Sequence, residues 1–431
     1  MNLQAAGTGL WLDNARVPAA LAEGFALRDV DAGTGLATAD LGVNRDGSFG
    51  APPAGARRID LQGRLVLPAF VDSHVHLDKA YTVARAGLPD GGLLAAVRLA
   101  GADAANWTEA DLESRMQRAL ARAHANGTAA MRTHLDTPVP PLQCASWQVL
   151  GRLRQGWRGR LDIQAVALMA LERVDDAADY AERCRQIATL DGVLGAFIAP
   201  GMATAARLDR LFEMAARHGL AVDFHVDETL DPEARGLEMI CDSLARTGFD
   251  GPVMAGHCCS LATMPQADRA RIIAKVAACG VHVVSLPHSN LFLQDRRAGT
   301  TPRHRGLTAV QELRAAGASV HFASDNVQDP FYPYGDYDMV EVFRSGVQTA
   351  QLEADLGVWL AGQCIEAARA CGFGGLGRLI PGGHADAIVF QARDLLDLMS
   401  RRAGPRLVIR QGVPVRPDHA DLSTLLTEEV R

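Results

Sequence analysis

Two histidines one residue apart, His74 and His76, follow the apolar run Leu65 to Val71. Residues i and i+2 of a β-strand lie on the same face, so a strand through this run directs both imidazoles to one side. Imidazole binds divalent metals, and such a pair can supply two ligands from a single strand end. An isolated His-x-His more often marks only a polar strand end. The metal hypothesis therefore depends on the rest of the chain.

Later apolar runs also end in residues that bind metals. His225 lies in DFHVDET, His257 in AGHCCS and Asp325 in FASDN. Three of these four imidazoles together with the carboxylate are a plausible ligand set for zinc or ferrous iron, with room left for a water. A metal of this kind lowers the pKa of its bound water towards neutrality and makes hydroxide available. The residues predict one divalent metal ion per chain, zinc or Fe(II).

The elements that must position these residues are apolar strand-like runs that alternate with amphipathic helical stretches from Leu65 onward. This alternation is typical of repeated βα units and a parallel sheet. Eight units predict a (β/α)8 barrel of the TIM type, whose catalytic groups lie at the carboxyl ends of the strands. The expected strands are Leu65 to Val71, Thr128 to His134, Leu161 to Met169, Val193 to Ala199, Ala221 to Val226, Val253 to Gly256, Val281 to Leu286 and Ser319 to Ser324.

Both chain ends have a different pattern. Before the barrel, short runs with turn residues between them predict small strands. They are Gly9 to Val17, Ala26 to Val30, Leu36 to Leu41 and Arg57 to Leu61. The runs Ala385 to Phe390 and Arg406 to Val415 are expected to complete the same module. We therefore divide the chain into a small β-sandwich module, 1–64 plus 380–431, and a barrel, 65–379.

Composition excludes several classes of protein. The net charge of −7 and the lack of a basic stripe argue against a nucleic-acid partner. The eight cysteines form no C-x-x-C pair, which fits free thiols in a reducing cytoplasm. The sequence shows neither a signal peptide nor a run of about 18 apolar residues. We expect a cytoplasmic protein without a membrane partner, a homo-oligomer that acts on a small molecule.

Several motifs together resemble the amidohydrolase superfamily, and within it the cytosine deaminase-like branch. They are His74-Val-His76, His225 followed by Glu228, Gly256-His257, and Asp325 followed by the segment DPFYPYG at 329–335. The resemblance covers nearly the whole chain. Some features, such as the sequence Ser324-Asp325-Asn326, are similar to the N-isopropylammelide isopropylaminohydrolase branch.

The resemblance implies a role for each site residue. His74, His76, His225 and Asp325 would hold the metal, Glu228 would be the proton shuttle, and His257 would contact the metal-bound water. Relatives with two metals carry a carboxylated lysine at the end of the fourth strand. The corresponding run Val193 to Ala199 has no lysine, which favours a single metal.

Hydrolytic removal of an amino group requires attack by hydroxide and two proton transfers. Asp325 can accept the proton of the water, and Glu228 can carry protons to the ring nitrogen and to the leaving amine. His257 can stabilise the developing tetrahedral centre through a hydrogen bond. Asp325, Glu228 and His257 are therefore the predicted catalytic residues.

Substrate contacts are where the chain departs from its relatives. In cytosine deaminase a glutamine after the third strand binds the pyrimidine amide edge, and Ala170 occupies the matching position here. Cytosine should therefore be a poor substrate unless Glu172 or a water substitutes. Asn326, Phe331 and His288 are further predicted substrate contacts.

Two other residues, His134 and Lys79, lie close to the ends of predicted strands in the sequence. We expect His134 to line the pocket, because it ends the second strand. Lys79, directly after His76-Leu-Asp, could face the mouth of the site, but a surface position is the commoner one for a lysine between a strand and a helix.

These observations predict a metal-dependent hydrolase that deaminates an amino-substituted pyrimidine-like or triazine-like heterocycle, with metal-bound hydroxide as the nucleophile. An alternative is removal of an alkylamine from such a ring, or opening of a cyclic amide. A third possibility is a non-catalytic assembly protein built on this fold. The intact set of ligands and shuttle argues against the third.

Overall fold

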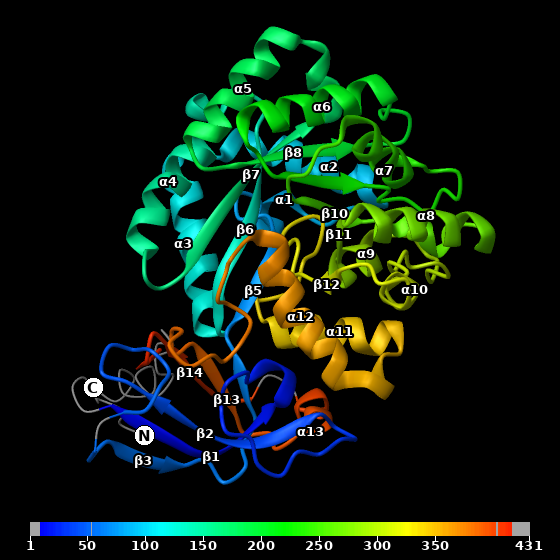
Figure 1. Cartoon of the computed structure of the whole chain (residues 1–431). Coiled ribbons are helices and arrows are strands. Elements are labelled where there is room, and N and C mark those ends of the chain that lie inside the picture. Colours follow the sequence, from blue (N-terminus) through cyan, green and yellow to red (C-terminus); the bar gives the residue numbers. More distant parts are fainter. Residues whose placement is uncertain (1–8, 53, 402–403, 416–431) are drawn as a thin grey trace.

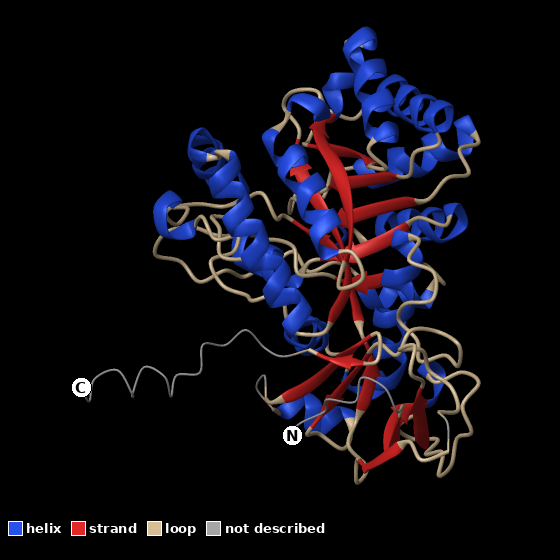
Figure 2. Ribbon diagram, turned by 90° about the vertical axis from the view of Figure 1, so that its left-hand side faces the viewer, coloured by secondary structure: helices blue, strands red, loops and turns tan. Residues whose placement is uncertain are grey.

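A computed structural model of the chain describes residues 9–52, 54–401 and 404–415. An eight-stranded parallel sheet runs in sequence order from β5 to β12 and is surrounded by helices (Figures 1 and 2). Its strands are β5 Phe70–Val75, β6 Thr128–Asp136, β7 Asp162–Ala170, β8 Val193–Ile198, β9 Val222–Val226, β10 Val253–His257, β11 His282–Ser285 and β12 Val320–Phe322.

The sheet closes between its first strand and the segment after its last strand. Val75 and Asp325 form a parallel bridge, and the Asp325 amide donates to the carbonyl of His74 over 2.8 Å. Closure confirms the expected TIM-type barrel and brings its first and last strands together. The carboxyl ends of β5 and β12 therefore supply residues to the same place.

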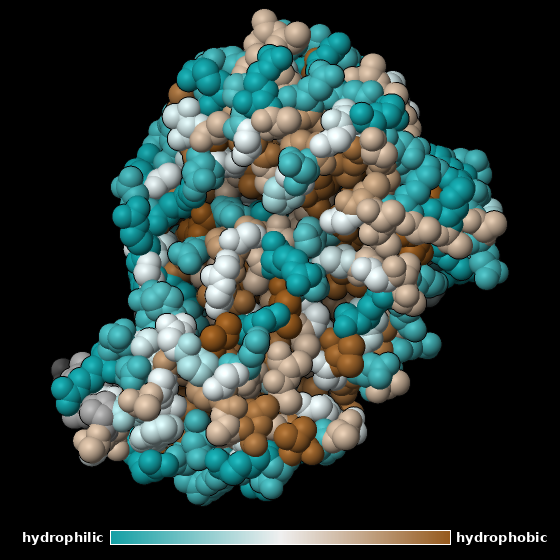
Figure 3. All heavy atoms as spheres, in the orientation of Figure 1, coloured by the Kyte–Doolittle hydropathy of each residue, from teal (hydrophilic) through white to brown (hydrophobic). Residues whose placement is uncertain are grey.

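Helices cover the outside of the barrel. They are α1 Val83–Ala86, α2 Leu93–Asp103, α3 Glu109–Ala125, α4 Ala145–Trp157, α5 Ala177–Thr189, α6 Ala205–His218, α7 Gly236–Thr247, α8 Gln266–Cys279, α9 Pro287–Leu293, α10 Val310–Ala315, α11 Met339–Ala350 and α12 Leu356–Cys371. The Thr108 hydroxyl caps α3 by accepting from the Asp111 amide. Asn126 ends that helix. Hydrophilic side chains dominate the outer helices, and apolar atoms show mainly in the recesses between them (Figure 3).

The expected strand Leu65 to Val71 is two strands. β4 Val66–Pro68 pairs antiparallel with β13 Ala387–Phe390, whereas β5 begins at Phe70 and enters the barrel. Val66 packs in the core of the small module, and Leu67 packs in the core of the barrel. A continuous apolar run cannot reveal such a division, because both halves are buried.

The small module is a sandwich of two sheets built from both parts of the chain. One sheet holds β1 Leu10–Pro18, β2 Leu36–Val43 and β3 Arg57–Asp60, and the other holds β4, β13, β14 Arg406–Arg410 and β15 Val413–Pro414. Side chains of both sheets share one hydrophobic core. A short helix, α13 Leu395–Ser400, lies between β13 and β14. The run Ala26 to Val30 forms no strand, only an isolated bridge from Arg28 to Thr38.

The exact division at 64/65 and 379/380 stays a prediction. Residues 1–8, 53, 402–403 and 416–431, which belong to the predicted module, lie outside the described residues. All eight cysteines are free thiols, as expected. Within the described ranges, none of the helices has both the length and the apolar character needed to cross a membrane.

Candidate active site

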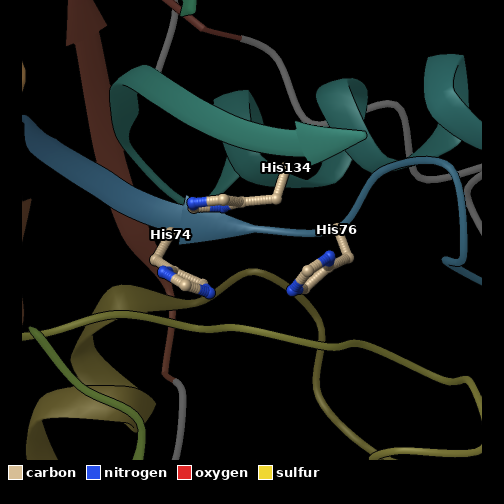
Figure 4. A group of neighbouring side chains, drawn as sticks. All are labelled: His74, His76 and His134. Atoms are coloured by element: carbon tan, nitrogen blue, oxygen red, sulfur yellow. The ribbon is translucent and has the colours of Figure 1, made fainter. Parts of the chain in front are cut away.

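Four side chains converge at the carboxyl end of the barrel: His74 and His76 at the end of β5, His225 in β9, and Asp325 after β12. Nε2 of His225 lies 3.1 Å from Nε2 of His74 and 3.2 Å from Nε2 of His76. Oδ1 of Asp325 lies 3.2 Å from Nε2 of His76 and 3.6 Å from Nε2 of His74. His74 and His76 project from the same side of their strand, with their ring edges facing each other (Figure 4).

The spacing of these four atoms fits a metal ion. With metal–ligand bonds of about 2.0 to 2.1 Å, tetrahedral ligands lie roughly 3.4 Å apart, close to the observed separations. Oδ1 of Asp325 has no hydrogen-bond partner among the described residues, although it is fully buried. Acceptor atoms that face one another in a dry site repel unless a positive charge lies between them. The cluster can therefore bind a divalent ion.

Burial sets the protonation states that such binding needs. The pKa values of His74, His76 and His225 lie well below the ordinary value, mainly because burial disfavours the charged ring. Neutral imidazoles offer a lone pair to a metal. Burial also raises the pKa of Asp325, and the Ser289 hydroxyl partly offsets this by donating to Oδ2. Ser289 thereby fixes the carboxylate and leaves Oδ1 to the cluster.

His257 ends β10 beside the cluster. Its ring nitrogen lies within 4.8 Å of those of His74 and His225. Burial lowers the pKa of His257 to about 4, so the ring is neutral at pH 7. The Asn290 amide nitrogen lies 2.9 Å from Nδ1, and with the amide donating, the ring carries its proton on Nε2. Nε2 is buried without a partner among the described residues and can donate to a reacting oxygen.

Glu228 lies on the loop after β9, with a side chain that is only 7 % exposed. Its Oε1 is 3.5 Å from Nδ1 of His257. Burial, followed by the charge of Asp325, raises the pKa of Glu228 well above the ordinary value. A carboxyl group with a raised pKa can hold a proton near neutral pH and release it during a reaction.

The backbone around these groups is locally strained. Asp227, His257 and Asp325 have φ angles of 51°, 71° and 60°, in the left-handed region that residues with a side chain rarely adopt. The Asp227 carboxylate accepts from the amides of Gly236 and Leu237, both over 3.0 Å, and so anchors the loop that carries Glu228. Strain of this kind persists at functional sites where the surrounding structure holds it in place.

His134, which is expected to line the pocket, is fully buried, and a ring nitrogen of it lies within 4.8 Å of ring nitrogens of His74 and His76. Its ring stacks on that of His74, with 3.9 Å between the centroids, and it projects from the neighbouring strand β6 (Figure 4). Its Nε2 is 3.2 Å from Oδ1 of Asp223, whose Oδ2 binds the guanidinium of Arg132 over 3.1 Å. His134 therefore supports His74 from below.

Lys79 is not on the surface. Its side chain is 6 % exposed, and Nζ lies 2.7 Å from Oδ1 of Asp136, 3.5 Å from Oδ1 of Asp78 and 3.4 Å from Nδ1 of His76. Two carboxylates supply the partners that a buried ammonium requires. The expectation of a surface lysine is wrong. Asp78 and Asp136, which are distant from each other in the sequence, both contact the Lys79 ammonium inside the mouth of the barrel.

A cavity of about 520 Å³ lies at the carboxyl ends of β6 and β7, and no residue of the cluster lines it. Asp136, Leu168 and Ala170 line it. Asp136 lies on the same face of β6 as Arg132, and Leu168 and Ala170 lie on the same face of β7 as Gln164. Arg132 and Gln164 are in the barrel interior and hydrogen bond to each other. Ala170 pairs in register with Phe197, which pairs with His225. Ala170 therefore lies in the same row of the sheet as His225, two strands away.

The other predicted substrate contacts lie in different surroundings. Asn326 is buried and donates to Oδ2 of Asp329 over 2.6 Å. Phe331 is half-buried, and its amide donates to Oδ1 of the same carboxylate. His288 is buried and stacks on Tyr332, with centroids 4.9 Å apart. Glu172 is not brought to the cluster: its side chain is 51 % exposed and lies 3.6 Å from Arg207.

Some residues of the site escaped sequence reasoning. Ser289 and Asn290 lie at the start of α9, directly after His288, and Asp136 ends the RTHLD segment. Phe197 has no polar atom and gave no chemical signal. The signal that could have found it is its strand position, in the same register row as His225.

Comparison with known proteins agrees with the fold and the site. The description "Amidohydrolase family" matches residues 57–143 and 117–416. A pterin deaminase from Rhizobium rhizogenes is 39% identical over 425 residues, which cover 96% of each chain. An N-isopropylammelide isopropyl amidohydrolase from Pseudomonas sp. (strain ADP) is 25% identical over 78% of this chain and 81% of its own.

A solved structure is similar over nearly the whole length. The 5-methylcytosine deaminase from Klebsiella pneumoniae, liganded with 5-fluorocytosine, superposes with a TM-score of 0.79 and 26% identity, covering 95% of this chain and 98% of its own. The chain belongs to the amidohydrolase family. It is an enzyme that acts on carbon–nitrogen bonds other than peptide bonds, which excludes the non-catalytic alternative.

Proposed function

We propose that this enzyme hydrolytically deaminates an amino-substituted heterocycle, and that a pterin, a fused 2-aminopyrimidinone, is the first substrate to test. The observation that carries this proposal is the convergence of three imidazole nitrogens and one carboxylate oxygen beside a buried glutamate. The overall reaction consumes one water, replaces the ring amino group by an oxo group and releases one ammonia.

His74, His76, His225 and Asp325 would hold one divalent ion, zinc or ferrous iron. Such an ion, when bound, acts as a Lewis acid that lowers the pKa of a water. The Asp325 carboxylate, oriented by Ser289, accepts the proton of the attacking water. The site is buried, so electrostatic interactions within it are stronger than in bulk water.

Glu228 and His257 complete the proton transfers. Glu228 holds a proton because burial raises its pKa, so it can protonate the ring nitrogen next to the attacked carbon and later the leaving amine. His257, with Nε2 as donor, stabilises negative charge on the attacking oxygen. Neither residue is a metal ligand in this scheme.

The pterin proposal has two supports beyond the shared chemistry. The relative with 39% identity over the whole chain is a pterin deaminase. The cavity beside Ala170 lies within the range of roughly 300 to 1,000 Å³ that small-molecule sites occupy, and we propose that the second fused ring extends towards it. A glutamine in place of Ala170 would fill part of that space.

A second candidate is removal of an alkylamine from a triazine ring. Ser324-Asp325-Asn326 and the relative from Pseudomonas favour it. Asn326, however, is already bound to Asp329 and offers only part of its amide to a substrate.

One assay separates these functions. Metal-supplemented enzyme is incubated with pterin, cytosine and an N-alkylaminotriazine, and ammonia and alkylamine are measured separately. We expect ammonia and a 2,4-dioxopteridine from pterin. Alkylamine release without ammonia from any ring would favour the second candidate and reject the first.

A further inference from the structure

Lys79 has one N–H that its protein neighbours do not satisfy when the metal ligands are in place. Nε2 of His76 faces the cluster, so the proton of the neutral ring lies on Nδ1. Nδ1 is the atom 3.4 Å from Nζ of Lys79, and a protonated Nδ1 cannot accept a hydrogen bond from an ammonium. The ammonium has three N–H groups, and Asp136 and Asp78 take two of them.

Asp136 has the complementary property. Its Oδ1 binds Lys79, whereas Oδ2 has no hydrogen-bond partner within the described part of the chain. The side chain is 45 % exposed and lines the cavity beside Ala170. An unsatisfied donor and a free acceptor thus lie next to each other at the mouth of the barrel.

The position of this pair is fixed from both sides. Asp78 is fully buried, and its Oδ2 accepts from the Asp136 amide over 2.8 Å. Arg115 donates to the carbonyls of Asp78 and Ala80 over 2.6 and 3.0 Å, which holds the segment that carries Lys79. One imidazole ring separates Lys79 from the cluster. A six-membered ring that presents its amino-bearing carbon to the cluster can therefore reach the pair with a neighbouring edge.

We propose that Lys79 and Asp136 bind the lactam edge of the substrate, with Lys79 donating to the ring carbonyl oxygen and Asp136 accepting from the adjacent ring N–H. This inference rests on the proposed function for the identity of the ring. It explains how a chain with Ala170 recognises such an edge without an amide side chain at that position. A ring with an amino group in place of the carbonyl presents the reverse pattern, a donor to Lys79 and an acceptor to Asp136.

The test compares the binding of two fluorescent pteridines, which requires no turnover. Lumazine carries the lactam edge, and 2,4-diaminopteridine carries the reversed pattern. We expect the wild type to bind lumazine at least about 100-fold more tightly, because a buried polar site rejects a ligand that leaves its groups unpaired.

Two variants and one control test whether Lys79 and Asp136 cause the preference for lumazine. Lys79→Met keeps the buried aliphatic stem but lacks the N–H donors, and Asp136→Asn keeps the shape of the side chain but adds a donor. Each variant should weaken lumazine binding about 10- to 100-fold and leave the affinity for 2,4-diaminopteridine unchanged or improved. Lys275→Met removes the only other lysine, which binds Glu238 and Asp242 at the surface, and should change neither affinity.

The outcomes are distinct. A wild type without preference, or variants that weaken both ligands equally, would overturn the inference. Loss of metal from both variants would assign Lys79 and Asp136 a purely structural role and overturn it as well. A wild type that prefers lumazine but releases no ammonia from any aminoheterocycle would contradict the proposed function and leave the recognition of the lactam edge standing.

Discussion

The metal cluster and the cavity beside Ala170 are built in different ways. Each ligand of the cluster lies in a barrel strand or within three residues of its end, and the strands are positioned by the barrel itself. The cavity instead depends on connecting segments, among them Trp107 before α3 and Pro138 and Val139 after β6. Barrel strands constrain the chemistry, whereas loops between them vary and set the substrate.

The largest expected effect comes from removing a ligand of the cluster. His225→Ala should lose the metal and reduce turnover by at least about 10³-fold, because the remaining groups supply neither the Lewis acid nor its geometry. Elemental analysis and an ammonia assay measure both effects. His304→Ala, at an exposed position, is the control and should retain metal and activity.

A smaller effect separates proton transfer from metal binding. Glu228→Gln keeps the shape of the side chain but cannot exchange protons, so turnover should fall by about 10²-fold or more while the metal content stays near that of the wild type. Wild-type activity in Glu228→Gln would remove the proton shuttle from the mechanism. Loss of metal would make Glu228 a ligand instead.

The residues of the cavity should determine which ring is preferred rather than the chemical step itself. Ala170 offers no hydrogen bond, so cytosine should be turned over at least about ten-fold less efficiently than the best ring in a panel, the scale of one lost hydrogen bond. Ala170→Gln should narrow that gap and weaken the binding of fused rings. The measurement is kcat/KM for each ring, and a wild type that prefers cytosine would contradict this account of the cavity.

The smallest effect is expected at Glu172, a predicted substrate contact that the structure leaves at the surface. Glu172→Gln should change kcat/KM by less than about two-fold, because an exposed ion pair such as that with Arg207 contributes little. A ten-fold loss with an unchanged melting temperature would return Glu172 to the site.

The contrast between barrel strands and connecting segments also explains which features could be predicted from the sequence. His74, His76, His225, His257 and Asp325 follow apolar runs, and the barrel brings strand ends together, so their meeting follows from the pattern. The choice of His74, His76, His225 and Asp325 as the metal ligands came from the family resemblance. Lys79 and Asp136 were not recognised as a pair because they are 57 residues apart and neither position shows a periodic signal. The break between β4 and β5 escaped prediction because one apolar run serves two cores.

The measurement that most directly tests the central claim is the metal content of the purified enzyme, followed through chelation and reconstitution. We expect one tightly bound divalent ion per chain, loss of ammonia release on its removal, and recovery with zinc or ferrous iron. Two functionally required ions per chain, or full activity in enzyme free of metal, would contradict the four-ligand site.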